Sequence, residues 1–124
     1  MIIDFLFVGM GGFIGSCLRF ALTKVTVYLG IEFPIGTLLS NVIAGSAIGF
    51  IIGLGVFSPR TKLFFVTGLL GGLSTFSAFS LETVNLFSDG RYLLCGLNVL
   101  LNLALSLSAV VLGMFLAGLI LKKV

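Results

Sequence analysis

The chain has 124 residues, of which 59% are hydrophobic and 9% are charged, whereas soluble globular domains carry about 25% charged residues. This composition and a mean hydropathy of +1.32 exclude an ordinary soluble domain and favour helices buried in lipid. The net charge of +3 comes from scattered basic residues, with Lys122 and Lys123 the one adjacent pair, so no phosphate-binding surface is expected and nucleic-acid binding is excluded.

The sequence contains four long uncharged stretches. Such stretches suit membrane-spanning helices, which need about 20 mainly apolar residues. We therefore predict an all-α integral membrane protein with four transmembrane helices in a single domain covering residues 1–124. The expected spans are residues 3–28, 34–56, 60–88 and 91–122.

An even number of spans places both termini on one side of the membrane. Four basic residues are expected near that side and three near the other, a difference too small to fix the orientation by the positive-inside rule. We therefore expect the chain to insert in both orientations. The first group is Arg60, Lys62, Lys122 and Lys123, and the second is Arg19, Lys24 and Arg91.

The first two spans are rich in glycine, which allows helix backbones to approach closely. These glycines are expected to pack helices together. They are Gly9, Gly11, Gly12 and Gly15 in the first span, and Gly45, Gly49 and Gly53 in the second. Cys17 and Cys95 form no ligand cluster, so we expect two small buried thiols rather than a disulfide or a metal site.

Asn41 lies well inside the second span, one turn after Thr37. A buried asparagine either joins two helices by hydrogen bonds or offers its amide to a passing ion, and the sequence leaves both interpretations open.

The third span contains the segment least suited to a helix. Gly71 and Gly72 are adjacent and are followed by Ser74 and Thr75, and each glycine costs a helix about 1 kcal/mol relative to alanine. We predict that the glycine pair breaks this helix, with a simple kink as the alternative. Carbonyl oxygens freed by a break at membrane depth are ready ligands for a cation.

One helix face follows this segment, formed by residues at positions i, i+3, i+4 and i+7: Phe76, Phe79, Ser80 and Thr83. An aromatic ring has a negative face and a positive edge, so ring edges along a pathway favour an anion. The alternative is that these phenylalanines simply pack in the core or face lipid.

The fourth span carries polar residues at i, i+4 and i+8, which form one stripe along a helix: Asn98, Asn102 and Ser106. Neutral amides and hydroxyls can replace the water around a small anion without trapping it. Hydrogen bonding between helices is the alternative.

The sequence offers little for enzymatic chemistry. It has no histidine, and its four carboxylates fall near the predicted span ends. A catalytic triad or a carboxylate pair therefore has no candidate residues, and we do not expect an enzyme.

Three segments, residues 11–19, 36–41 and 71–80, together resemble the Fluc (CrcB) fluoride-channel family in order and spacing. The resemblance implies passive fluoride export, and so fluoride resistance, across a prokaryotic cytoplasmic membrane. It also implies a dual-topology homodimer of antiparallel subunits with two pores and a structural sodium ion at its centre.

The resemblance also implies residue roles. The fluoride pathway would comprise Asn41, Phe76, Phe79, Ser80, Thr83, Asn98, Asn102 and Ser106. The vestibule residues would be Arg19, Thr37 and Glu82, and the sodium ligands would be the backbone carbonyls of Gly71 and Ser74. Ala78 stands where the family commonly has Thr or Ser, so no role is carried over to it.

Two other classes share the length and span count. A small dual-topology multidrug or guanidinium exporter would require a carboxylate inside the first span, and none lies between Asp4 and Arg19. A helical subunit that scaffolds a larger complex is the third possibility.

Overall fold

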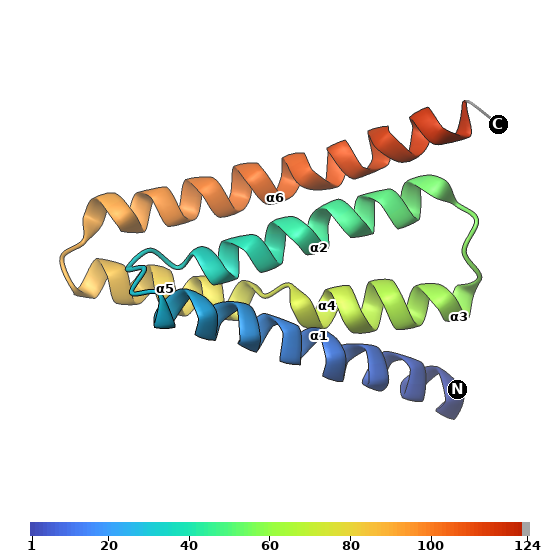
Figure 1. Cartoon of the computed structure of the whole chain (residues 1–124), viewed down its shortest axis with the longest axis horizontal. Helices are drawn as coiled ribbons and strands as arrows, with labels where there is room; N and C mark the ends of the chain where they lie inside the picture. The colour runs from blue at the N-terminus through green and yellow to red at the C-terminus, as the bar shows by residue number, and fades with distance from the viewer. Residues whose placement is uncertain (123–124) are drawn as a thin grey trace.

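A computed structural model describes residues 1–122 of the chain. Four helical spans run back and forth, and both ends of the described chain lie at the same end of the bundle (Figure 1). The helices are α1 (Ile2–Tyr28), α2 (Ile35–Leu54), α3 (Pro59–Lys62), the π-helix η1 (Leu63–Leu70), α4 (Gly71–Leu73), α5 (Phe76–Ser88) and α6 (Tyr92–Leu121).

Four helices are long and apolar enough to cross a membrane, as predicted, and they begin and end within two residues of the expected bounds. They are Ile2–Tyr28, Ile35–Leu54, Pro59–Ser88 and Tyr92–Leu121. The third span is built from α3, η1, α4 and α5 in succession, and its π-helical stretch was not predicted. α2 packs along α6, α1 packs against η1 and α4, and α5 packs against α6.

Glycines make the close contact between α2 and α6 possible. A Cβ added to Gly53 would lie 2.8 Å from the Cβ of Ala117, and one added to Gly49 would overlap the carbonyl oxygen of Val110. The predicted packing role of the second-span glycines is therefore confirmed. In the first span, Gly11 and Gly15 pack in the same way against η1 and α4, but nothing lies within 4 Å of a Cβ at Gly9, so the prediction was wrong there.

Gly49→Leu should destabilise the bundle severely, because the backbones of α2 and α6 must separate, and overpacking of this kind costs about 1–3 kcal/mol or more. Gly9→Leu is the matched control, since it makes the same change in a helix where no atom opposes the new side chain. Size-exclusion chromatography after graded heating should show early loss of the monodisperse peak for Gly49→Leu alone. Equal loss in both variants would contradict the role given to Gly49.

The predicted break in the third span is present, but it does not fall on the glycines. Gly71 is helical, with φ −66° and ψ −34°, whereas Ser74 has φ −76° and ψ 152° and Thr75 has φ −156° and ψ 125°. Glycine is retained at Gly72 for a packing reason, because a Cβ there would lie 2.7 Å from the carbonyl oxygen of Gly12. The modest helix penalty of Gly72 is thus outweighed by its packing against α1.

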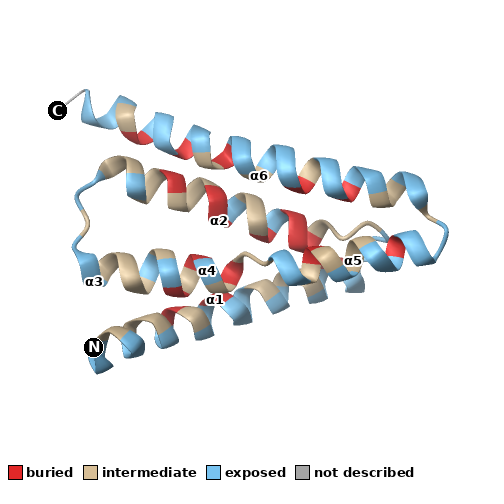
Figure 2. Ribbon diagram, turned by 180° about the vertical axis from the view of Figure 1, so that it is seen from behind, coloured by how far each residue is buried: buried red, intermediate tan, exposed pale blue. Residues whose placement is uncertain are grey.

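Most large apolar side chains of the chain are exposed, and buried residues form a thin line where the spans meet (Figure 2). A small core around Ala44, Leu70 and Leu73 joins α2 to the third span. An exterior of this kind requires lipid or another apolar surface around it. Cys17 lies on this exterior, so the prediction of a buried thiol was wrong for it, because α1 uses only its glycine-rich face for packing; Cys95 is half-buried, and both thiols are free.

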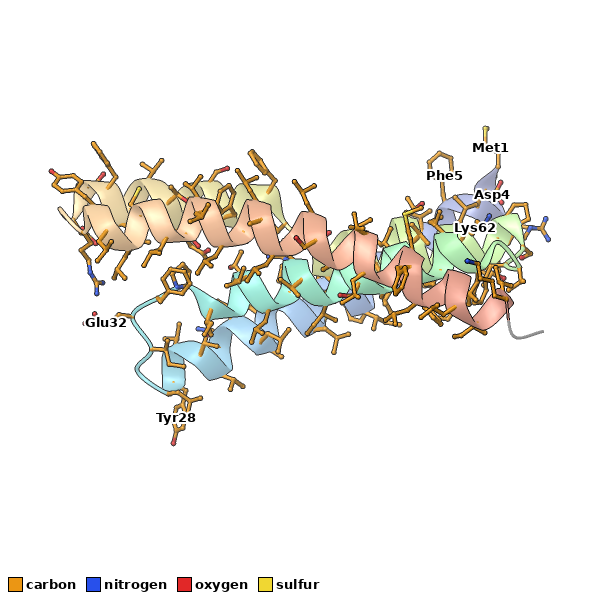
Figure 3. The ribbon with its side chains drawn as sticks, turned by 90° about the horizontal axis from the view of Figure 1, so that it is seen from above. Met1, Asp4, Phe5, Tyr28, Glu32 and Lys62 are labelled. Carbon is orange, nitrogen blue, oxygen red and sulfur yellow. The ribbon has the colours of Figure 1, made fainter. Side chains whose placement is uncertain are left out.

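Charged side chains lie at both ends of the bundle, with Asp4 and Lys62 at one end and Glu32 at the other (Figure 3). At the end with the N-terminus, Asp4 pairs with the Met1 amino group and lies 3.9 Å from Arg60. At the opposite end, Arg91 pairs with Glu32 and ties the loop after α5 to the loop after α1. Lys123, counted above with the basic residues near the termini, lies outside the described residues.

Candidate functional site

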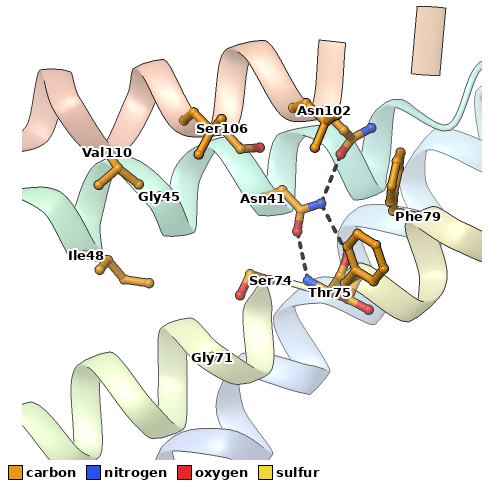
Figure 4. A pocket seen from close by; sticks show the side chains of 13 residues that line it. Asn41, Gly45, Ile48, Gly71, Ser74, Thr75, Phe79, Asn102, Ser106 and Val110 are labelled. Carbon is orange, nitrogen blue, oxygen red and sulfur yellow. Dashed lines mark hydrogen bonds between the residues drawn. The ribbon is translucent and has the colours of Figure 1, made fainter. Parts of the chain in front are cut away.

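A groove of about 500 Å³ opens between α2, α6 and the break in the third span (Figure 4). It brings together seven of the residues that the resemblance assigned to the fluoride pathway or the sodium site. These are Asn41, Gly71, Ser74, Phe76, Phe79, Asn102 and Ser106. Ser80, Thr83 and Asn98 do not line it, and neither does any charged residue.

Both the nitrogen and the oxygen of the Asn41 side-chain amide form hydrogen bonds with the broken segment. Its Nδ2 donates to the carbonyl oxygen of Thr75 over 3.3 Å, and the Thr75 N–H donates to its Oδ1 over 2.8 Å (Figure 4). This pair of bonds replaces the helical hydrogen bonds that the break removes. Asn41 therefore both fixes the break and presents its amide in the groove.

A chain of amides continues from Asn41 through the polar stripe of α6. Asn41 Nδ2 donates to Asn102 Oδ1, and Asn102 Nδ2 donates to Asn98 Oδ1, each over 2.9 Å. Asn98 Nδ2 donates to Thr83 Oγ1 over 2.9 Å, and Thr83 Oγ1 donates to the Phe79 carbonyl over 2.7 Å. All the donors point the same way, and such aligned bonds strengthen one another in a low-dielectric interior.

Ser106 is the member of this stripe that stays unpaired. Its Oγ is buried in the groove without a hydrogen-bond partner in residues 1–122. A buried hydroxyl without a partner costs about 1–3 kcal/mol. It is therefore ready to donate to an ion or a water that enters the groove.

Phe76 and Phe79 lie at the start of α5, with ring centroids 5.4 Å apart and ring planes at 55°. Phe79 is 8% exposed and Phe76 is 73% exposed, so only one of the two rings is enclosed by this chain. Ser80 lies on the same helix but does not line the groove, and its Oγ donates to the Phe76 carbonyl over 2.8 Å.

Thr37 and Glu82 form a separate pair between α2 and α5. The Thr37 hydroxyl donates to Glu82 Oε1 over 2.6 Å, and Glu82 Oε2 has no partner in the described part of the chain. Thr37 is 1% exposed. Neither residue lines the groove.

Arg19 lies well inside the first span. Since α1 ends at Tyr28, as the expected bounds of residues 3–28 imply, Arg19 is about 14 Å from the helix end at 1.5 Å per residue. Its Nε donates to the carbonyl oxygen of Gly72 over 3.2 Å, beside the break.

The backbone at the break presents carbonyl oxygens from one helix and N–H groups from the next. Gly71 and Ser74 border the groove, and none of the described residues donates a hydrogen bond to their carbonyl oxygens. Thr75 caps α5 by accepting from the Ala78 N–H over 3.2 Å, which leaves the earlier N–H groups of that helix free to attract negative charge. No cluster of three His, Cys, Asp or Glu side chains occurs in residues 1–122, so a metal ion would need carbonyl ligands.

Sequence reasoning missed the central position of Thr75 and the apolar walls of the groove, which Ile48 and Val110 help to form. Thr75 carried a readable signal, because threonine is a preferred residue immediately before a helix. Ile48 and Val110 carried none, since any apolar residue of a membrane span is equally suited to lipid.

These features define a four-span integral membrane protein with a neutral polar groove at a broken helix. Residues 6–114 match the family described as CrcB-like protein, Camphor Resistance (CrcB). The chain is 44% identical over 119 residues to a fluoride-specific ion channel FluC of Clostridium novyi, covering 91% of this chain and 92% of the relative. A protein of the same name from Pyrococcus abyssi is 42% identical over 113 residues, covering 87% and 90%.

The chain belongs to the CrcB family, as the resemblance of its three sequence segments implied. The relatives are named as ion channels, a class of membrane protein without enzymatic activity, which confirms the prediction that the chain is not an enzyme. They give no support to the exporter alternative.

Proposed function

We propose that the protein is a fluoride-selective channel for passive efflux of cytoplasmic fluoride. The observation that carries this proposal is the groove, in which Asn41, Ser106 and two phenylalanine rings meet without a charged side chain. Neutral donors can bind a small anion and release it again, whereas a buried cation would hold it. The name carried by the relatives, fluoride-specific ion channel, supports fluoride as the ion.

The groove requires a second wall, and we propose that a second copy of the chain supplies it in an antiparallel homodimer with two pores. Phe76 borders the groove yet is 73% exposed, and most of the apolar exterior is uncovered in the single chain. The near balance of basic residues at the two ends of the bundle supports insertion in both orientations.

A structural sodium ion at the centre of that dimer is part of the proposal. The carbonyl oxygens of Gly71 and Ser74 suit a hard cation, because they come from a broken helix and accept no hydrogen bond within the described chain. Two such segments, one from each copy, would provide four carbonyl ligands. Bound there, sodium would offset the partial negative charge of these helix ends.

Passive flow suffices for export from a prokaryotic cell. Hydrogen fluoride enters as a neutral molecule and ionises in the cytoplasm, and an inside-negative potential drives the anion out with about 2.3 kcal/mol per charge per 100 mV. We place the protein in the cytoplasmic membrane, with the Thr37–Glu82 pair facing a vestibule that leads to the groove.

Fluoride efflux from proteoliposomes containing this chain alone, read with a fluoride electrode, tests the proposal. We expect rapid efflux once an ionophore clamps the potential, and none from protein-free liposomes. Efflux no faster than in protein-free liposomes, or chloride efflux as fast as that of fluoride, would refute it. Activity of the single chain would also exclude the scaffold alternative.

A further inference from the structure

Arg19 is a cation within a membrane span that forms no ion pair in residues 1–122. The three ion pairs among these residues involve Met1, Arg60 and Arg91 instead. Its contact is the hydrogen bond from Nε to the Gly72 carbonyl. A charge at this depth is costly unless the protein compensates it. The hydrogen bond to the Gly72 carbonyl therefore indicates what Arg19 does.

The Gly72 carbonyl belongs to the end of a helical run that extends from Pro59 to Leu73. The last four carbonyl groups of a helix lack partners inside it, and together they carry about half a negative charge. Ser74 meets one of them, because its N–H and Oγ both donate to the Leu70 carbonyl over 2.9 Å. Arg19 donates to another of these carbonyl groups, that of Gly72. Its positive charge has the sign that this helix end favours.

The path of α1 leaves the guanidinium little freedom. Gly15, one turn before Arg19, lies so close to α4 that a Cβ would come within 2.8 Å of the Leu73 nitrogen. Gly72 approaches α1 in the same way, against Gly12. Arg19 shares the face of Gly15, since residues four apart lie one above the other on a helix. The same close packing thus aims Arg19 at the helix end.

We propose that Arg19 is a positioning residue that caps the broken helix, and that it keeps the peptides around Gly72 oriented rather than drawing fluoride in by its charge. The proposal rests on the channel function proposed above. Gly71 precedes Gly72 directly and Ser74 follows it two residues later, so loss of the cap would disturb the carbonyls that border the groove. The role differs from that of a vestibule residue, for which charge alone would matter.

Flux measured against fluoride concentration separates the two roles in Arg19→Gln. Loss of the cap should lower the maximum flux about tenfold or more, because the charge-assisted hydrogen bond to the Gly72 carbonyl is removed. The half-saturating concentration should stay within about twofold of the parent. The loss should be equal at about 0.01 M and about 1 M of an impermeant salt, between which the Debye length falls from about 30 to 3 Å.

Three comparisons complete the test. The parent chain must conduct, so failure of the channel function itself is recognised separately. Lys24→Gln removes another cation of α1, whose ammonium lies 5.4 Å from the centroid of the Phe20 ring, and it should leave the maximum flux unchanged. Hydrogen exchange of the amides in residues 71–76 should speed up in Arg19→Gln and not in Lys24→Gln.

An unchanged maximum flux in Arg19→Gln, with a higher half-saturating concentration that salt abolishes, would overturn the proposal in favour of charge attraction. If Arg19→Gln does not fold, Arg19→Lys takes its place. Lysine keeps the charge but lacks the planar N–H array, so its maximum flux should fall below that of the parent. A maximum flux equal to the parent's in Arg19→Lys would overturn the proposal.

Discussion

Asn41→Ala should lower fluoride flux by roughly 10- to 100-fold, equivalent to about 1.4–2.7 kcal/mol in the barrier. The substitution removes the two bonds to Thr75 and the donor to Asn102. The Thr75 N–H and Asn102 Oδ1 lose their partners, and each buried polar group left unpaired costs about 1–3 kcal/mol. The groove also loses the amide that joins the Thr75 backbone to Asn102.

Asn85→Ala is the matched control for Asn41→Ala. It removes the same atoms from an exposed position on α5 whose side chain makes no hydrogen bond in the described structure. Efflux from proteoliposomes with equal amounts of reconstituted protein checks both variants. Parental flux in Asn41→Ala would leave Asn41 with the helix-packing role that the sequence alone also allowed.

Composition was sufficient to predict the spans, and the four-residue spacing of polar residues was sufficient to predict the polar stripe. Long apolar stretches have few stable arrangements other than spanning helices, and a spacing of four residues places Asn98, Asn102 and Ser106 on one face of any helix. The hydrogen bonds between Asn98 and Asn102 follow directly from that spacing. The partners on other helices, such as Thr83 and Asn41, do not.

The position of the break shows where local reasoning fails. Helix propensity placed it at Gly71 and Gly72, but both residues are helical, and Gly72 is needed for close packing against α1. Ser74 and Thr75 leave the helix instead, where Asn41 and the Thr75 cap supply replacement bonds. The contact of Arg19 with Gly72 depends on how α1 crosses α4, which no spacing within one span encodes.

The difference between the two phenylalanines has a physical meaning for the pathway. They are three residues apart on one helix face, yet Phe79 is 8% and Phe76 73% exposed, so the rest of the chain covers the first ring and leaves the second open. In the channel proposed above, a single chain would thus build half of an aromatic constriction. The exposed ring of Phe76 is the half that must meet whatever closes the groove.

Phe76→Ile should therefore cut fluoride flux while leaving the fold of the single chain intact. Isoleucine keeps much of the apolar volume but has no ring edge with positive charge to face an anion. Ring electrostatics are worth about 0.5–2 kcal/mol, with the larger values where water is excluded, so we expect a loss of roughly 3- to 30-fold. The electrode-read efflux assay measures it.

Phe13→Ile makes the same change at a ring of equal exposure, 72% against 73%, on the outer surface of α1. If ring edges in the groove matter, flux falls in Phe76→Ile and stays at the parental level in Phe13→Ile. Equal flux in the two variants would remove Phe76 from the pathway and leave the amides and Ser106 as the anion-binding groups. A fall confined to Phe76→Ile would show that a neutral groove selects its anion partly through the orientation of an aromatic ring.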